Sequence, residues 1–269
     1  MTDGAKRMES HDPYLPKPPP GQDELPCSDG EPMDTPRHRR QMNLLIESLE
    51  LTLGARDDVY VGGDMFVWYS ELQTKKKKDF RGPDVFVVLG AIAGRTRKSW
   101  VVWEEDGKLP DVVIELTSPT TEHIDRGEKK QIYERIWRLP EYFIFDPDTK
   151  ALDGWRLIDG RYVPIDADAR GELECRALGL RLGVREGVFQ REETAWLRWI
   201  DPATGLQLPT STENLAEAER RLGALTARAE EEKARADEEK ARADEERARA
   251  DALAAEVAEL RRRAEMDAC

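Results

Sequence analysis

The chain has 269 residues, a formal net charge of −13 and charged side chains at 36% of its positions. This acidic balance argues against attraction of the whole protein to nucleic acid or to an anionic membrane, so any such contact must be local. The three cysteines show no CxxC or Cys/His spacing, so the sequence supports neither a disulfide framework nor a zinc site. The sequence has no apolar run of 18 residues and no signal-peptide pattern at its start. We therefore expect a soluble, cytoplasmic protein.

The first 36 residues are rich in proline. They hold half of the chain's 16 prolines, including the run Pro18-Pro19-Pro20. Proline fixes φ and removes a backbone donor, so this composition predicts a disordered leader over residues 1–36.

Alternating helix and strand patterns follow over residues 37–210. Thr35 and Pro36 precede apolar residues at helical spacing, which predicts a capped helix. Short β-branched and aromatic runs come next, and we expect them to be neighbouring strands of one sheet: VYVGGDMFVWYS, PDVFVV, SWVVWEE and DVVIELT. A second helix is expected over residues 121–138, with Ile132, Ile136 and Leu139 toward the sheet. The run EYFIFD predicts a strand, and LDGWRLI and GRYVPI predict a hairpin through Asp159-Gly160.

The last segment, residues 212–269, has a different composition. It has no proline or aromatic residue, and EEKARAD recurs with a period of seven. Such residues favour helix. When residues 212–269 are arranged in heptads, both ends of the segment carry apolar residues at the two seam positions. In the middle of the segment these positions hold alanine and glutamate. A weak coiled coil that forms a homodimer and a lone charged helix both fit this pattern.

Two carboxylates stand where chemistry is expected. Asp84 heads one strand, and Glu115 shares one face of its own strand with Asp111, Val113 and Thr117, because side chains alternate with period two. If Asp84 and Glu115 lie at adjacent strand ends, a cation must neutralise them. Oxygen ligands without histidine or cysteine suit Mg²⁺ or Mn²⁺. A phosphodiester could complete such a site, and a nearby lysine would stabilise the developing charge.

The order of these residues resembles the PD-(D/E)XK nuclease superfamily and, within it, the Uma-two family of restriction endonucleases. The resemblance covers residues 38–205. It rests on Asp84, Glu115, the turn Ser118-Pro119, a helix with Asp125, Lys129 and Tyr133 at spacing four, the strand from Glu141-Tyr142 to Asp146-Pro147, and His38 in the first helix.

The resemblance implies a restriction-endonuclease-like core of α/β class, in which helices flank a mixed sheet and a long charged helix follows. It implies Asp84 and Glu115 as metal ligands and Lys129 as the catalytic lysine. The superfamily lysine usually lies two residues after the acid, where this chain has Thr117. Lys129 would therefore reach the site from the following helix, and its neighbour Lys130 points about 100° away around that helix.

Each residue also has a plainer explanation. Asp84 could simply open its strand, Asp125 and Lys129 could be a surface ion pair, and Tyr133 is expected to pack with its hydroxyl on a polar partner. His38 is expected to be structural, and Asp111 to begin a strand rather than bind metal. Glu115 is harder to explain away, because burying a carboxylate among apolar residues is costly unless something pairs with it.

One compact basic run precedes Asp84. It consists of Lys75, Lys76, Lys77, Lys78 and Arg81. A solvated loop and a patch that contacts the DNA backbone are both consistent with it. The leading hypothesis is thus a Mg²⁺-dependent DNA endonuclease. The alternatives are a catalytically silent nucleic-acid-binding module and a coiled-coil assembly protein.

Overall fold

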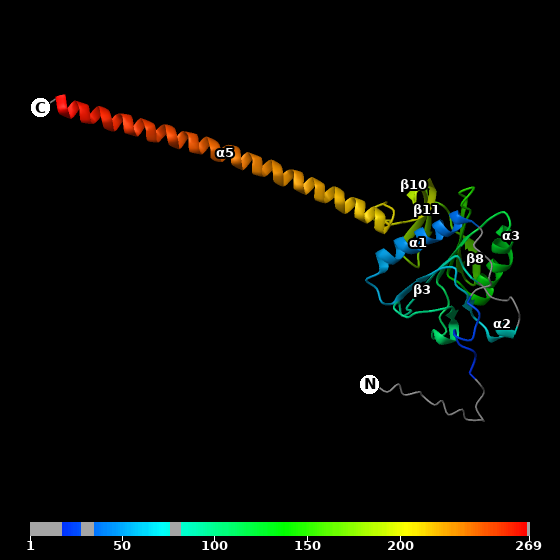
Figure 1. Cartoon of the computed structure of the whole chain (residues 1–269). Helices are drawn as coiled ribbons and strands as arrows, with labels where there is room; N and C mark the ends of the chain where they lie inside the picture. Colours follow the sequence, from blue (N-terminus) through cyan, green and yellow to red (C-terminus); the bar gives the residue numbers. More distant parts are fainter. Residues whose placement is uncertain (1–17, 28–34, 76–81, 268–269) are drawn as a thin grey trace, which may run out of the picture. The chain divides into compact units, whose positions relative to one another are not determined.

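The computed structural model describes residues 18–27, 35–75 and 82–267 (Figure 1). The chain divides into two compact units, residues 1–211 and 212–269. Within the described ranges, no helix combines the length and apolar character that a membrane crossing needs.

A six-stranded mixed sheet forms the centre of the first unit, with strand order β1-β3-β5-β6-β7-β8. Its strands are β1 (Val59–Gly62), β3 (Val85–Leu89), β5 (Val112–Leu116), β6 (Glu141–Phe145), β7 (Leu152–Ile158) and β8 (Arg161–Pro164). β5 and β6 are parallel, and the other neighbours pair antiparallel. The parallel pair needs a crossover connection, which the helical segment after β5 provides. The expected mixed sheet and α/β class are confirmed.

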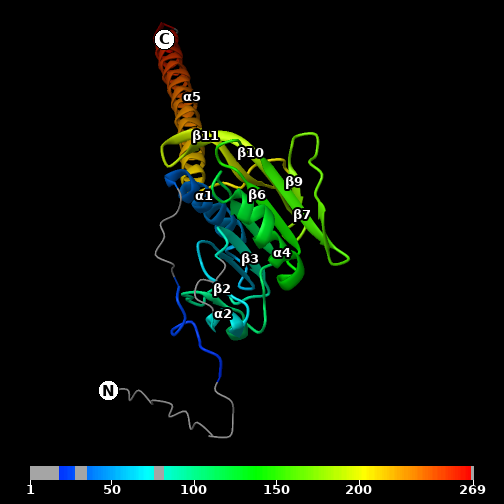
Figure 2. The same cartoon turned by 90° about the vertical axis from the view of Figure 1, so that its right-hand side faces the viewer.

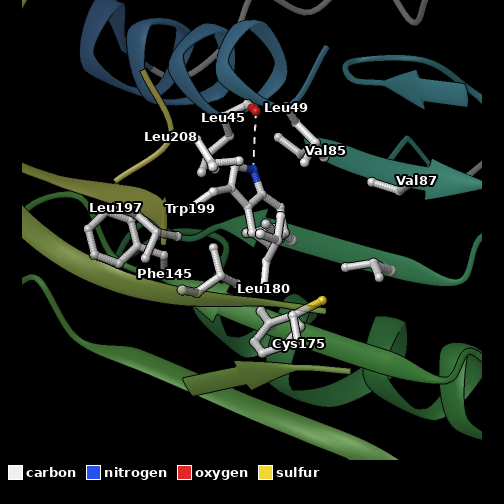
Figure 3. Packing of buried hydrophobic residues seen from close by; sticks show 14 of the residues in the cluster. Leu45, Leu49, Val85, Val87, Phe145, Cys175, Leu180, Leu197, Trp199 and Leu208 are labelled. Atoms are coloured by element: carbon white, nitrogen blue, oxygen red, sulfur yellow. Dashed lines mark hydrogen bonds between the residues drawn. The ribbon is translucent and has the colours of Figure 1, made fainter. Parts of the chain in front are cut away.

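One face of this sheet is covered by α1 (Pro36–Leu53) and by a three-stranded sheet of β9 (Leu173–Cys175), β10 (Leu180–Phe189) and β11 (Glu192–Ile200). The helix begins as predicted, because the Thr35 hydroxyl accepts a hydrogen bond from the backbone N–H of His38 at 3.2 Å. In Figure 3 the indole of Trp199 lies below α1 and donates to the carbonyl of Leu45, at 3.1 Å. This bond lets a large polar-edged ring fill the core.

The other face is covered by the helical segment over residues 122–137. It comprises α3 (Glu122–Ile124), a π-helical turn η2 (Asp125–Lys129), α4 (Lys130–Ile132) and a second π-helical turn η3 (Tyr133–Trp137). Tyr133 and Trp137 are buried against Val113 and Tyr142 of the sheet. The expected inward position of Ile136 is wrong, since this side chain is 55% exposed. Arg138 takes a left-handed conformation, and Leu139 after it is buried.

The expectation that all early strands share one sheet is also wrong. The run from Val59 to Ser70 contains two strands, and the second, β2 (Val67–Trp68), pairs in parallel with β4 (Trp100–Val101) in a separate sheet. A short 3₁₀ turn η1 (Val102–Glu104) follows β4, and α2 (Glu71–Lys75) follows β2. β10 and β11 pair with each other as one long antiparallel hairpin (Figure 2).

Part of the proline-rich leader is ordered against the fold. Leu25 is buried with Phe66, Trp68 and Val101. The indole N–H groups of Trp68 and Trp103 donate to the carbonyls of Pro26 and Pro20. The prediction of disorder is therefore wrong for residues 18–27, because tryptophan donors satisfy carbonyls that the prolines leave free. The rest of that prediction, residues 1–17 and 28–34, lies outside the described residues.

The second unit is the single helix α5 (Ser211–Asp267), which confirms the helix predicted for the tail. The apolar side chains of its heptad ends are exposed, among them Leu222, Leu225, Leu253, Val257 and Leu260.

Candidate active site

The ladder between β3 and β5 places Asp84 opposite Glu115. The two strands are antiparallel, with Val85 opposite Ile114. One further step along this register sets Asp84, just ahead of β3, across from Glu115. The backbone N–H of Leu116 donates to Oδ2 of Asp84 at 2.7 Å, and the Asp84 nitrogen lies 3.5 Å from Oε2 of Glu115. The strand pairing therefore brings together two acids that are 31 residues apart.

Glu115 is fully buried on the sheet face that the helical segment covers. Its two oxygens have separate partners. Oε1 accepts a hydrogen bond of 2.7 Å from the hydroxyl of Tyr133, and Oε2 lies 3.0 Å from the ammonium of Lys129. These partners offset part of the cost of burying a carboxylate. Tyr133 thus packs with its hydroxyl on a polar partner, as expected from the sequence.

Lys129 reaches this pair from the π-helical turn η2. Its ammonium also lies 2.9 Å from Oδ1 of Asp125, one turn earlier, and its side chain keeps 20% of its surface exposed. Asp125 is only 2% exposed. The hydroxyl of Tyr142 on β6 donates to the Asp125 carbonyl at 2.9 Å. The helix-borne lysine is therefore at the site, and the pair with Asp125 is not the surface pair that the plain explanation predicts.

The site carries an excess of negative charge. Burial raises the pKa of Glu115 to about 8, and the charges of Asp84 and Asp125 add to this effect while Lys129 opposes it. Burial likewise raises the pKa of Asp84 to about 6, against the opposing effects of Lys129 and the Leu116 N–H. Burial would lower the pKa of Lys129, but the surrounding carboxylates outweigh it and raise that pKa. The lysine stays charged, and at neutral pH the Glu115 carboxyl holds a proton that a cation could displace.

The residues present fit a hard divalent cation. Among the described residues, no group of three or more His, Cys, Asp and Glu side chains is arranged to hold a metal ion. The protein would thus supply the two carboxylates of Asp84 and Glu115. Magnesium is commonly held in this way, with one or two carboxylates and the remaining positions filled by water and substrate phosphate.

Other residues named from the sequence lie around the site or away from it. The Nε2–H of His38 donates to the carbonyl of Thr117 at 3.2 Å, and its Nδ1 lies 3.2 Å from the Thr35 hydroxyl, so this histidine connects α1 to the end of β5. Oδ2 of Asp111 accepts from the Leu89 N–H at 2.7 Å, a structural role. The ammonium of Lys130 stacks over the ring of Trp155 and not at the site.

The predicted basic run lies almost wholly outside the part of the chain that the structure describes. Lys76, Lys77, Lys78 and Arg81 lie outside the described residues, and Lys75 ends α2 with an undescribed side chain. The basic residues on the connection between β3 and β4 are engaged within the fold. Arg97 is buried and makes a bidentate pair with Glu105, and Lys98 pairs with Asp23.

Asp125 and Tyr142 contribute more to the site than the sequence indicated. The spacing of Asp125 and Lys129 placed them on one helical face, but nothing in that spacing showed that the face is buried. Tyr142 was noted only as part of a strand pattern. A useful signal was the four-residue spacing that continues through Tyr133 to Trp137, since aromatic residues at those positions indicate an inward face.

Comparison with known proteins assigns the family. Residues 19–185 match the model of the Uma2 (Uma-two) family, which is described as "Putative restriction endonuclease". This stretch is more than half of the chain. The chain belongs to the Uma2 family. Membership confirms the resemblance noted from the sequence.

Two individual proteins are similar to this Uma2 chain. An uncharacterized protein of Synechocystis sp. (strain ATCC 27184 / PCC 6803 / Kazusa) is 29% identical over 126 residues, which span 46% of this chain and 63% of that protein. A crystal structure from Anabaena variabilis ATCC 29413, titled a "putative nuclease belonging to DUF820", is 15% identical with a TM-score of 0.38. The alignment covers 59% of this chain and 90% of that one.

Proposed function

We propose that the protein is a divalent-metal-dependent endonuclease that hydrolyses phosphodiester bonds of DNA. The observation that carries the proposal is the contact between Lys129 and Glu115 beside Asp84. An acid at a strand start, an acid within the next strand and a lysine from the following helix meet at one point. Membership of the Uma2 family supports a nuclease activity for this arrangement.

Asp84 and Glu115 would hold Mg²⁺ or Mn²⁺ in this proposal. Such an ion polarises a phosphoryl oxygen and makes a water molecule more acidic. Tyr133 fixes the rotation of the Glu115 carboxylate by holding Oε1, which leaves Oε2 for exchange between partners. The ammonium of Lys129 supplies a positive charge for the phosphate oxygens as negative charge builds up on them.

The charge of the site favours a single divalent ion. When all groups are ionised, the carboxylates of Asp84, Glu115 and Asp125 outnumber the ammonium of Lys129 by two charges. One doubly charged cation neutralises this excess. Two such ions would leave the site positive before the substrate phosphate arrives, and among the described residues no group of three or more acids is arranged to hold metal.

We infer that Lys75, Lys76, Lys77, Lys78 and Arg81 contact the DNA backbone, since this run directly precedes Asp84 in an otherwise acidic chain. We also infer a cytoplasmic protein and a homodimer through α5, whose apolar heptad ends are exposed.

Plasmid nicking with Mg²⁺ or Mn²⁺ tests the activity. The unchanged protein is expected to nick supercoiled DNA only with metal, and Glu115→Ala and Lys129→Ala are expected to lose the activity. Glu122→Gln is the matched control, because Glu122 lies on the same helical segment in an exposed pair with Arg126. DNA binding without metal or cleavage would instead indicate a catalytically silent binding module.

A further inference from the structure

Lys129 has two acidic partners, and they belong to different parts of the fold. Glu115 is carried by the central sheet, whereas Asp125 lies on the same helical segment as the lysine. The proposed function requires Glu115 to bind a metal ion. A cation at Glu115 would take the carboxylate from Lys129 and repel its ammonium, since like charges a few ångströms apart repel strongly in a buried site. A lysine with no second partner would then leave the site.

Asp125 is not explained by an ordinary helix pair. Glu122 and Arg126 form such a pair three residues earlier in the chain, with side chains that are 52% and 36% exposed, whereas Asp125 is 2% exposed. A third buried carboxylate costs free energy, because its charge opposes the ionisation of Asp84 and Glu115. Its own Oδ1 faces the Lys129 ammonium, and no described group of three acids forms a metal cluster. The carboxylate is therefore engaged with the lysine.

The backbone of Asp125 is also held. Its carbonyl accepts the hydroxyl of Tyr142, a residue of β6 on the same sheet as Glu115. Asp125 thus has a fixed position relative to the metal-binding strand while remaining on the lysine's own helical segment.

We propose that Asp125 is a positioning residue that keeps the ammonium of Lys129 at the site after Glu115 has turned to the metal ion. The inference rests on the proposed function. Without metal the lysine bridges both carboxylates. With metal, Asp125 alone retains it, and the ammonium is left facing the substrate phosphate.

A double-mutant cycle in unfolding tests this without catalysis. Asp125→Asn, Lys129→Met and the double variant are unfolded in urea, each with EDTA and with saturating Mg²⁺. The two substitutions are expected to be non-additive by at least about fivefold in the unfolding equilibrium constant, with Mg²⁺ present. The pair Glu122→Gln and Arg126→Gln is the control and should be close to additive, since it is exposed. Additive effects of Asp125→Asn and Lys129→Met in Mg²⁺ would overturn the inference.

Cleavage kinetics give the second readout. Asp125→Asn is expected to lower kcat at least about tenfold with KM for DNA changed less than about twofold, because the lysine acts on the transition state. Asp125→Glu should recover part of this loss, and Asp125→Asn should cost nothing further in Lys129→Met. Unchanged kcat in Asp125→Asn contradicts the positioning role while leaving the nuclease proposal intact. A wild-type protein that neither binds Mg²⁺ nor cleaves DNA contradicts the proposed function itself.

Discussion

The ammonium of Lys129 lies 3.0 Å from Oε2 of Glu115, although one residue is on a helical segment and the other is at the centre of a sheet. The strand position two residues after Glu115, where the superfamily usually carries its lysine, holds Thr117 with its side chain buried. The positive charge is thus supplied from a second element.

The metal-free protein should become less stable as pH rises from about 5 to about 8. The folded-state pKa values of Glu115, about 8, and Asp84, about 6, lie above the usual carboxyl values. Protons are therefore bound more tightly in the folded chain, and their stabilising effect, present in full below the unfolded-state pKa, is lost as pH rises through the folded one. We expect a loss of at least about 1 kcal/mol in the free energy of unfolding.

Urea unfolding in EDTA at pH 5, 7 and 8 measures this slope. Glu115→Gln should remove most of it, whereas Glu122→Gln, on the exposed face, should leave it in place. A free energy of unfolding that rises over this interval in the unchanged protein would contradict the buried charge excess.

Magnesium should stabilise the protein more at pH 8 than at pH 5. A cation competes with protons for Asp84 and Glu115, so its affinity rises as these groups ionise. Thermal unfolding with and without Mg²⁺ gives the shift in Tm at each pH. Glu115→Ala should abolish the shift, and an equal shift in that variant would place the metal elsewhere.

Removing the Tyr133 hydroxyl should weaken both the fold and the site. Tyr133→Phe leaves Oε1 of the buried Glu115 without its donor, which should cost about 1–2 kcal/mol in unfolding free energy. It should also lower Mg²⁺ affinity at pH 7, because the hydrogen bond favours the ionised Glu115. Tyr162→Phe is the matched control, since the buried Tyr162 hydroxyl has no hydrogen-bond partner among the described residues. Equal effects of both substitutions would indicate a packing role only.

The alternation of strand residues correctly predicted the face of the sheet on which Glu115 lies. It placed Glu115 on the same face as Val113, and the ladder then set Asp84 opposite. The inward face of the helix was predicted less well, because the two π-helical turns favour the four-residue series Asp125, Lys129, Tyr133 and Trp137 over Ile136. A period of 3.6 residues cannot show such turns before the helix is packed.

Short strands and the ordered leader were harder to predict because distant contacts decide them. β2 and β4 contain two residues each and pair across more than 30 positions. Residues 18–27 are held by Trp68 and Trp103, whose indoles no local pattern connects with proline. The roles of Asp84, Glu115 and Lys129 stay predictions, although their positions together agree with what those roles require.

Truncation of the charged helix should not weaken the first unit. Residues 1–211 and 212–269 are separate compact units, so deleting residues 212–269 should leave the urea midpoint of the domain unchanged. The exposed leucines of α5 predict a dimer for the full chain and a monomer for the truncated one. Light scattering gives both masses. A monomeric full-length chain would rule out assembly through α5.

The most direct test of the proposed catalytic site is a single-turnover cleavage rate on one linear DNA duplex in Mg²⁺. The rate is measured for the unchanged chain, for Glu115→Gln and for Lys129→Met, after circular dichroism shows that all three are folded. We predict that metal-dependent cleavage in the unchanged chain falls by at least about a hundredfold in each variant. Cleavage at the full rate in either variant would contradict the assignment of that residue to the reaction.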